Sequence, residues 1–168
     1  MTIPLWLYTT LLTVHNLLRW VVVILGVIAL ARAWTGWISK RPYTPADSRI
    51  GMIFGGMFDL QVLLGLILYF IPGTFTYTAF RNFGPAMGDS VTRFFALEHI
   101  LMMLISLVVV HIGSARAKKT AGDPARHRVT ALWFSAAFLI LFLAIPWSPA
   151  SFLGAERPLL RIFGLILP

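Results

Sequence analysis

Two histidines lie inside long apolar segments of this chain, and their chemistry is the most informative that the sequence offers. His15 lies near the middle of the first apolar segment, and His99 lies near the start of the third. Ionisable side chains are costly in membrane hydrocarbon, so those found there usually serve a function. Because imidazole is a common axial ligand of haem iron, this pair predicts a membrane protein that binds a cofactor.

The two histidines are expected at the same depth in a membrane. With the first and third spans centred near residues 20 and 104, each histidine lies about five residues, or roughly 8 Å, from the centre on the same side. Successive helices with short connections run antiparallel, so spans one and three can face each other across a bundle. This geometry predicts that His15 and His99 are the axial ligands of one haem b.

Three further residues are expected to line the cofactor. Asn16 follows His15 directly, and Arg19 follows it by about one helical turn, where it can stabilise a haem propionate. Gly65 is expected opposite His99, since the two lie equally far from the centre of the connection between spans two and three. A glycine there leaves room for a flat macrocycle or a close helix contact.

A buried ion pair is expected beside the histidines. Arg19 and Asp59 share a depth across the first helical hairpin, and an unpaired charge in hydrocarbon is strongly unfavourable. Glu98 is the third charged residue of this set, and Gln61 is expected to join the hydrogen-bond network. The pair either fixes the register of the helices or helps to orient a propionate or carry protons.

His111 and His127 are candidates for a second metal site. They are symmetric about residue 119 in the connection between spans three and four, so they could approach one another. His127 is flanked by Arg126 and Arg128, which is typical of a charge cluster at the membrane surface. Both interpretations stay open at this point, a second haem or two interfacial histidines.

Membrane-spanning helices must position these residues. Of the 168 residues, 58% are hydrophobic and 12% are charged, which is more apolar than one soluble core can bury. Four segments have the length of about 20 residues that a helix needs to cross hydrocarbon, at about residues 7–33, 50–71, 93–115 and 129–146. The sequence predicts an all-α integral membrane protein, a four-helix up-down bundle formed by a single transmembrane domain over residues 1–168.

The tail, residues 148–168, is too short for a fifth span. It is interrupted by Pro149 and Pro158 but is strongly apolar around its few charged residues. We expect a short helix that lies on the membrane surface or against a partner subunit.

Basic residues predict the orientation of the spans. Lys and Arg gather in the first and third connections, at Lys40, Arg41, Arg49, Arg116, Lys118, Lys119, Arg126 and Arg128. By the positive-inside rule these connections face the cytoplasm, and both termini face the periplasm or exterior of a bacterial inner membrane. The net charge of +8 is explained by this asymmetry, so no nucleic-acid partner is expected.

Several other chemistries are excluded or find no support. The chain has no cysteine, which rules out thiolate metal sites and iron–sulfur clusters within it. It also has no glycine-rich nucleotide motif and no nucleophile–base arrangement, so no catalytic residue is predicted.

The segments TVHNLLRWVVVILG and LEHILMMLISLVVVHIG carry the two histidines of the proposed site. They resemble the histidine-bearing helices of bacterial membrane b-type cytochromes, including the small four-helix cytochrome b561-like proteins. The resemblance covers spans one and three and implies haem b and electron transfer with quinone. Members of that family carry two haems on four histidines within their spans, whereas spans two and four of this chain have none in their apolar interior.

Three functions are compatible with these residues. The first is an electron-transfer cytochrome, rather than a stand-alone enzyme, that works between quinol and a periplasmic or complex-bound partner. The second is an accessory subunit of a larger respiratory or photosynthetic membrane complex that binds haem, a chlorophyll-type pigment or no cofactor. The third is a cofactor-free proton carrier built on Arg19, Asp59, Glu98 and His15.

Overall fold

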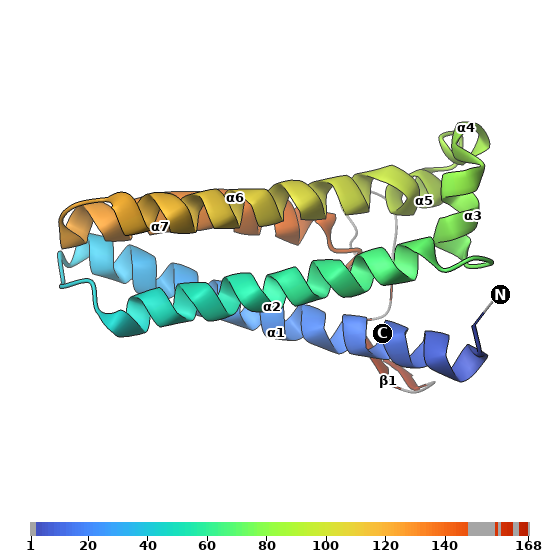
Figure 1. Cartoon of the computed structure of the whole chain (residues 1–168), viewed down its shortest axis with the longest axis horizontal. Coiled ribbons are helices and arrows are strands. Elements are labelled where there is room, and N and C mark those ends of the chain that lie inside the picture. Colours follow the sequence, from blue (N-terminus) through green and yellow to red (C-terminus); the bar gives the residue numbers. More distant parts are fainter. Residues whose placement is uncertain (1–2, 148–156, 158, 163–164, 168) are drawn as a thin grey trace.

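The computed structural model shows four long helices in an antiparallel bundle (Figure 1). It describes residues 3–147, 157, 159–162 and 165–167. The long helices are α1 (Leu5–Ile38), α2 (Pro45–Phe70), α6 (His99–Lys119) and α7 (Asp123–Ala144). Each is long and apolar enough to cross a membrane, with the third span beginning at Ser90. The chain is a multi-pass, all-α membrane bundle, as the sequence predicts.

The four helices form a ring in which α1 and α6 occupy opposite corners. The neighbouring pairs are α1 with α2, α2 with α6, α6 with α7, and α7 with α1. The connections between α1 and α2 and between α6 and α7 are short, which makes the helices of each pair antiparallel neighbours. The two helices that carry His15 and His99 therefore face each other across the interior.

Aromatic and small side chains fill the bundle core. Phe54, Phe58 and Phe134 are almost completely buried between the helices. At Gly113 of α6, an added Cβ would lie only 2.5 Å from the Cβ of Trp133 on α7, so the two helices approach closely there. Close packing at small residues is a main source of helix association in membranes, where lipid chains are as apolar as the core.

Short helices close one end of the bundle, which we call the α3 end (Figure 1). They are α3 (Phe75–Arg81), α4 (Phe83–Ala86) and α5 (Ser90–Arg93), followed by a π-helical turn, η1 (Phe94–Glu98), that leads into α6. The side chains of Thr74 and Asp89 begin α3 and α5 by accepting hydrogen bonds from backbone N–H groups of the first turn.

The described part of the tail is a β-hairpin and not the expected helix. Its strands are β1 (Leu160–Ile162) and β2 (Leu165–Leu167), which pair antiparallel. The strand β1 packs against α1, and the carbonyl of Leu159 accepts hydrogen bonds from Arg19 Nη2 at 2.5 Å and Trp20 Nε1 at 2.8 Å. These contacts are distant in sequence, so local periodicity could not reveal them. The remaining tail residues, 148–156, 158, 163–164 and 168, lie outside the described part of the chain.

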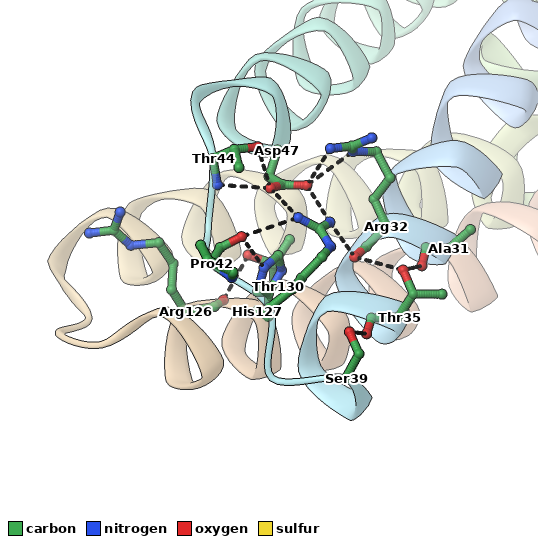
Figure 2. Close-up of polar contacts among 11 residues, drawn as sticks. Ala31, Arg32, Thr35, Ser39, Pro42, Thr44, Asp47, Arg126, His127 and Thr130 are labelled. Atoms are coloured by element: carbon green, nitrogen blue, oxygen red, sulfur yellow. Dashed lines mark hydrogen bonds and ion pairs between the residues drawn. The ribbon is translucent and has the colours of Figure 1, made fainter.

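Asp47 in the first turn of α2 organises the opposite end of the bundle (Figure 2). Its carboxylate accepts hydrogen bonds from Arg32 Nε at 3.0 Å and from Arg41 Nη1 and Nη2 at 2.7 and 2.6 Å. It also accepts from the backbone N–H and the hydroxyl of Thr44, which completes a capping box. The hydrogen bond to Asp47 raises the pKa of the Arg41 guanidinium above its ordinary value. Arg41, assigned from the sequence to membrane orientation, therefore also fixes the connection between α1 and α2.

Replacing Asp47 by asparagine is expected to destabilise the folded protein, because an uncharged amide cannot accept from both arginines and from Thr44. Since Arg32 and Arg41 keep 39% and 29% of their side chains exposed, solvent screens part of this interaction. We expect a loss of about 1–3 kcal/mol, measured as a lower thermal unfolding temperature in detergent. Asp123→Asn, at an exposed position in the first turn of α7, is the control. Equal unfolding temperatures of the two variants would contradict this role of Asp47.

Candidate functional site

A cavity of about 460 Å³ lies inside the bundle toward the α3 end. Its walls are mostly apolar, with a few polar groups from α1, α2 and α6, which is the usual character of a site of this size for a small molecule or cofactor. The residues predicted to bind the cofactor all line this one cavity, namely His15, Asn16, Arg19, Gly65 and His99. The structure thus brings together side chains that are up to 84 positions apart in the sequence.

The imidazole of His99 has one nitrogen fixed by the backbone and the other available. Nδ1 lies 2.8 Å from the carbonyl oxygen of Ala144 at the end of α7. Because a carbonyl can only accept, Nδ1 carries the proton and Nε2 keeps its lone pair. Among the described residues, none makes a hydrogen bond to Nε2. Metal-binding histidines typically donate their other ring N–H to a carbonyl or carboxylate, so His99 has the tautomer that a ligand requires.

The π-helical turn η1 directly precedes His99 and contributes to its position. A π-helical turn changes the angular position of the side chains that follow it, and such turns often occur at functional sites. The hydroxyl of Tyr69 on α2 donates to the carbonyl of Ala96 within this turn at 2.6 Å. The rings of Phe94 and Phe95 pack with centroids 5.6 and 6.1 Å from that of His99. The imidazole is therefore held by the hydrogen bond to Ala144 and by two neighbouring phenylalanine rings.

His15 is held by Gln61 of α2. The amide Nε2 of Gln61 lies 3.2 Å from Nε2 of His15 and donates to the backbone carbonyl of His15 at 3.0 Å. Within the described structure, His15 Nδ1 and Gln61 Oε1 are buried and have no hydrogen-bond partner. Buried polar atoms without a partner are rare and often mark the place of an ion or ligand. Gln61 thus joins a hydrogen-bond network, and its partner there is His15.

Gly65 makes room for His15 and does not contact His99. An added Cβ at Gly65 would lie 3.1 Å from Cε1 of the His15 ring, which is tighter than an ordinary contact. The sequence places Gly65 opposite His99 with room for a macrocycle; both residues line the cavity, and the ring nearest to Gly65 is that of His15. The depth of a residue in the membrane does not determine which neighbouring helix it faces.

Within the described part of the chain, two arginines line the cavity. The guanidinium of Arg19 lies 5.5 Å from the Trp20 ring and 5.8 Å from the Trp147 ring, and only 8% of the residue is exposed. Arg157, which comes from the tail, lies 4.4 Å from the centroid of Phe95. Guanidinium groups bind carboxylates through paired hydrogen bonds, so both are suited to acidic groups of a bound cofactor. The sequence offered no signal for Arg157, because its segment has no regular pattern.

The predicted ion pair between Arg19 and Asp59 does not form. Asp59 lies on the outer face of α2, where its Oδ1 is 2.8 Å from Nε2 of His111 on α6. Arg19 instead lines the cavity. The reason is helical phase, since Asp59 is two residues from Gln61 and therefore about 200° away from it around the helix.

Glu98, the third charged residue of the predicted set, pairs with Arg93. Its Oε1 lies 2.8 Å from Arg93 Nε, just before the start of α6. Glu98, Asp59 and Arg19 thus contact different partners among the described residues. They do not form one network.

His111 and His127 do not approach one another. His127 is completely buried, and its ring packs against Gly36 and lies 4.8 Å from the Tyr43 ring, with Nε2 3.5 Å from the carbonyl of Pro42 (Figure 2). The space beside it measures about 10 Å³, which cannot hold a haem. His127 is thus neither a surface residue nor part of a second cofactor pocket, and it serves to pack the connection between α1 and α2.

Comparisons with models of known protein families, with curated proteins and with solved structures gave no match to this chain.

Proposed function

We propose that this protein is a membrane-embedded b-type cytochrome that holds one haem b between His15 and His99. The observation that carries the proposal is the state of His99. Its Nδ1 proton is committed to the carbonyl of Ala144, and its free Nε2 belongs to a residue that lines the same cavity as His15. The resemblance of the two histidine-bearing segments to those of b-type cytochromes supports the same conclusion.

The donor atoms available to such a group are Nε2 of His99, which keeps its lone pair, and at His15 the unpartnered ring nitrogen Nδ1. When bound, haem b supplies reversible one-electron transfer at its iron. His99 and His15 come from opposite corners of the bundle and line the same cavity, so these two imidazoles would hold the haem iron. Arg19 and Arg157 provide positive charge for the propionates, and Asn16 adds a polar side chain to the same wall. The apolar remainder of the lining excludes water and lowers the local dielectric, which tunes the redox potential.

We place the protein in a bacterial inner membrane with the cavity toward the outer side. The support is the distribution of basic residues, which gather at the two connections opposite the α3 end. The cavity lies toward the α3 end, so an electron partner at the outer surface could approach it. Quinol is the proposed donor, and the acceptor is a periplasmic protein or another membrane subunit.

The residues considered for cofactor-free proton transfer do not support that alternative. Asp59 lies outside the bundle interior and pairs with His111, whereas Glu98 pairs with Arg93. A continuous path from His15 through these carboxylates is not built by the described side chains.

The experiment is quinol-driven reduction of the purified protein in lipid vesicles. We expect the absorption bands of reduced haem b to appear when a short-chain quinol is added to the oxidised protein. Bands that appear with a chemical reductant but not with quinol would contradict the proposed donor. Absence of the bands under both conditions would contradict the haem itself.

A further inference from the structure

A polar pair, Asp59 and His111, lies on the outer surface of the bundle, within two helices that are long and apolar enough to cross a membrane. Asp59 is close to the midpoint of α2, and His111 lies about two turns inside α6 from its basic end at Lys119. The two side chains are 48% and 53% exposed, and their neighbours Leu63 and Val108 are exposed apolar residues. Lipid chains offer no hydrogen bonds, so this surface is unfavourable for a polar pair that stands alone.

The pair has zero net charge in two arrangements of its protons. Each arrangement leaves one hydrogen-bond donor and one hydrogen-bond acceptor unused. If the carboxylate is ionised and the imidazole is protonated, Nδ1–H of His111 can donate and the second oxygen of Asp59 can accept. If the proton instead lies on Asp59 and is donated to Nε2, the neutral ring carries its hydrogen on Nδ1, and the acid keeps its carbonyl oxygen. Among the described residues, none occupies either position. The pair is therefore complementary to a second copy of itself.

A glycine on the same face of α2 leaves space for another helix. The space beside Gly51 is occupied by Phe134 of this chain, 3.6 Å from an added Cβ. The space beside Gly55 is occupied by Val110, 3.7 Å from an added Cβ. Gly56 has nothing within 4 Å and lies one helical turn from Asp59. In membranes, a small residue next to a hydrogen-bonding side chain is the typical composition of a helix–helix contact.

We propose that two copies of the chain associate through this face of α2 and α6, centred on Gly56, Asp59 and His111. Two copies inserted in the same direction are related by a twofold axis along the membrane normal, so identical residues lie at identical depth. His111 of one copy then meets Asp59 of the other at the same height, and Gly56 allows the two α2 helices to come close. The inference is independent of the haem site.

The absence of cysteine makes a crosslinking test direct. Gly56→Cys is compared with Leu132→Cys, which places a thiol at an exposed position on α7, at the opposite corner of the ring. Membranes that contain each variant are oxidised, and the products are separated by mass. We expect a product of twice the chain mass for Gly56→Cys and little for Leu132→Cys. Adding Asp59→Leu and His111→Leu to the Gly56→Cys chain should lower the crosslinked fraction several-fold.

Four results would overturn the proposal. The Gly56→Cys chain could stay monomeric, it could crosslink no more than the Leu132→Cys chain, or it could crosslink to a protein of different mass. A crosslinked fraction that is unchanged by loss of the polar pair would show that Asp59 and His111 do not mediate association. Because both side chains are exposed in the single chain, their replacement by leucine should leave the fold intact, which thermal unfolding of the monomer checks.

Discussion

Replacement of His99 by alanine is expected to abolish haem binding. The substitution removes an imidazole that lines the cavity and leaves the carbonyl of Ala144 without its donor. Haem content per chain, measured on the purified protein after extraction of the cofactor, should fall to background. His111→Ala is the matched control, because that histidine lies on the outer surface and should be replaceable without loss of haem. Equal haem content in the two variants would contradict the assignment of the ligand.

A second readout separates ligation from folding in the same variant. Alanine leaves an imidazole-sized space beside the cavity, so imidazole added to the solution should restore part of the haem binding. A purely structural role of His99 predicts no such recovery. Recovery by imidazole together with an unchanged unfolding temperature would assign the nitrogen atom itself as the functional group.

Replacement of Gly36 by alanine is expected to destabilise the whole bundle. An added Cβ would overlap the ring of His127, which is completely buried against α1. Overpacking of this kind typically costs about 1–3 kcal/mol, and more where the neighbour cannot move. The ring is confined by Tyr43 and Pro42, so we expect an effect at the upper end of this range, seen as a lower unfolding temperature and lower yield.

The control for this variant is Gly84→Ala. An added Cβ at Gly84 meets nothing within 4 Å, so the same chemical change should have little effect on stability there. Combining Gly36→Ala with His127→Ala should recover part of the lost stability, because the second substitution removes the ring that the first one meets. Additive losses in the double variant would show that the two residues are not in contact.

Those features of the fold that depend on length and apolarity could be predicted from the sequence. Four long apolar segments can pack as membrane-spanning helices in only a few arrangements. One of these is an up-down ring that places α1 opposite α6. The shared depth of His15 and His99 follows from counting residues along antiparallel helices. Their presence at one cavity is consistent with that count.

The sequence could not predict the angular position of side chains around their helices, or the contacts between segments that are distant in the chain. The sequence predicts Asp59 inside the bundle. In the structure Gln61, two positions away, lies on the inner side of α2, and Asp59 lies on the outer side. The turn η1 changes the angular position of His99, and the hydrophobic pattern of the sequence does not reveal this turn. The basic neighbours of His127 suggested the membrane surface, whereas a glycine on α1 allows its ring to be buried. The hairpin of the tail depends on hydrogen bonds to α1.

The absorption spectrum of the purified protein tests the central claim most directly. We expect a Soret band and the reduced-minus-oxidised bands of haem b, with one haem for each chain. A colourless protein, or a pigment without iron, would contradict it.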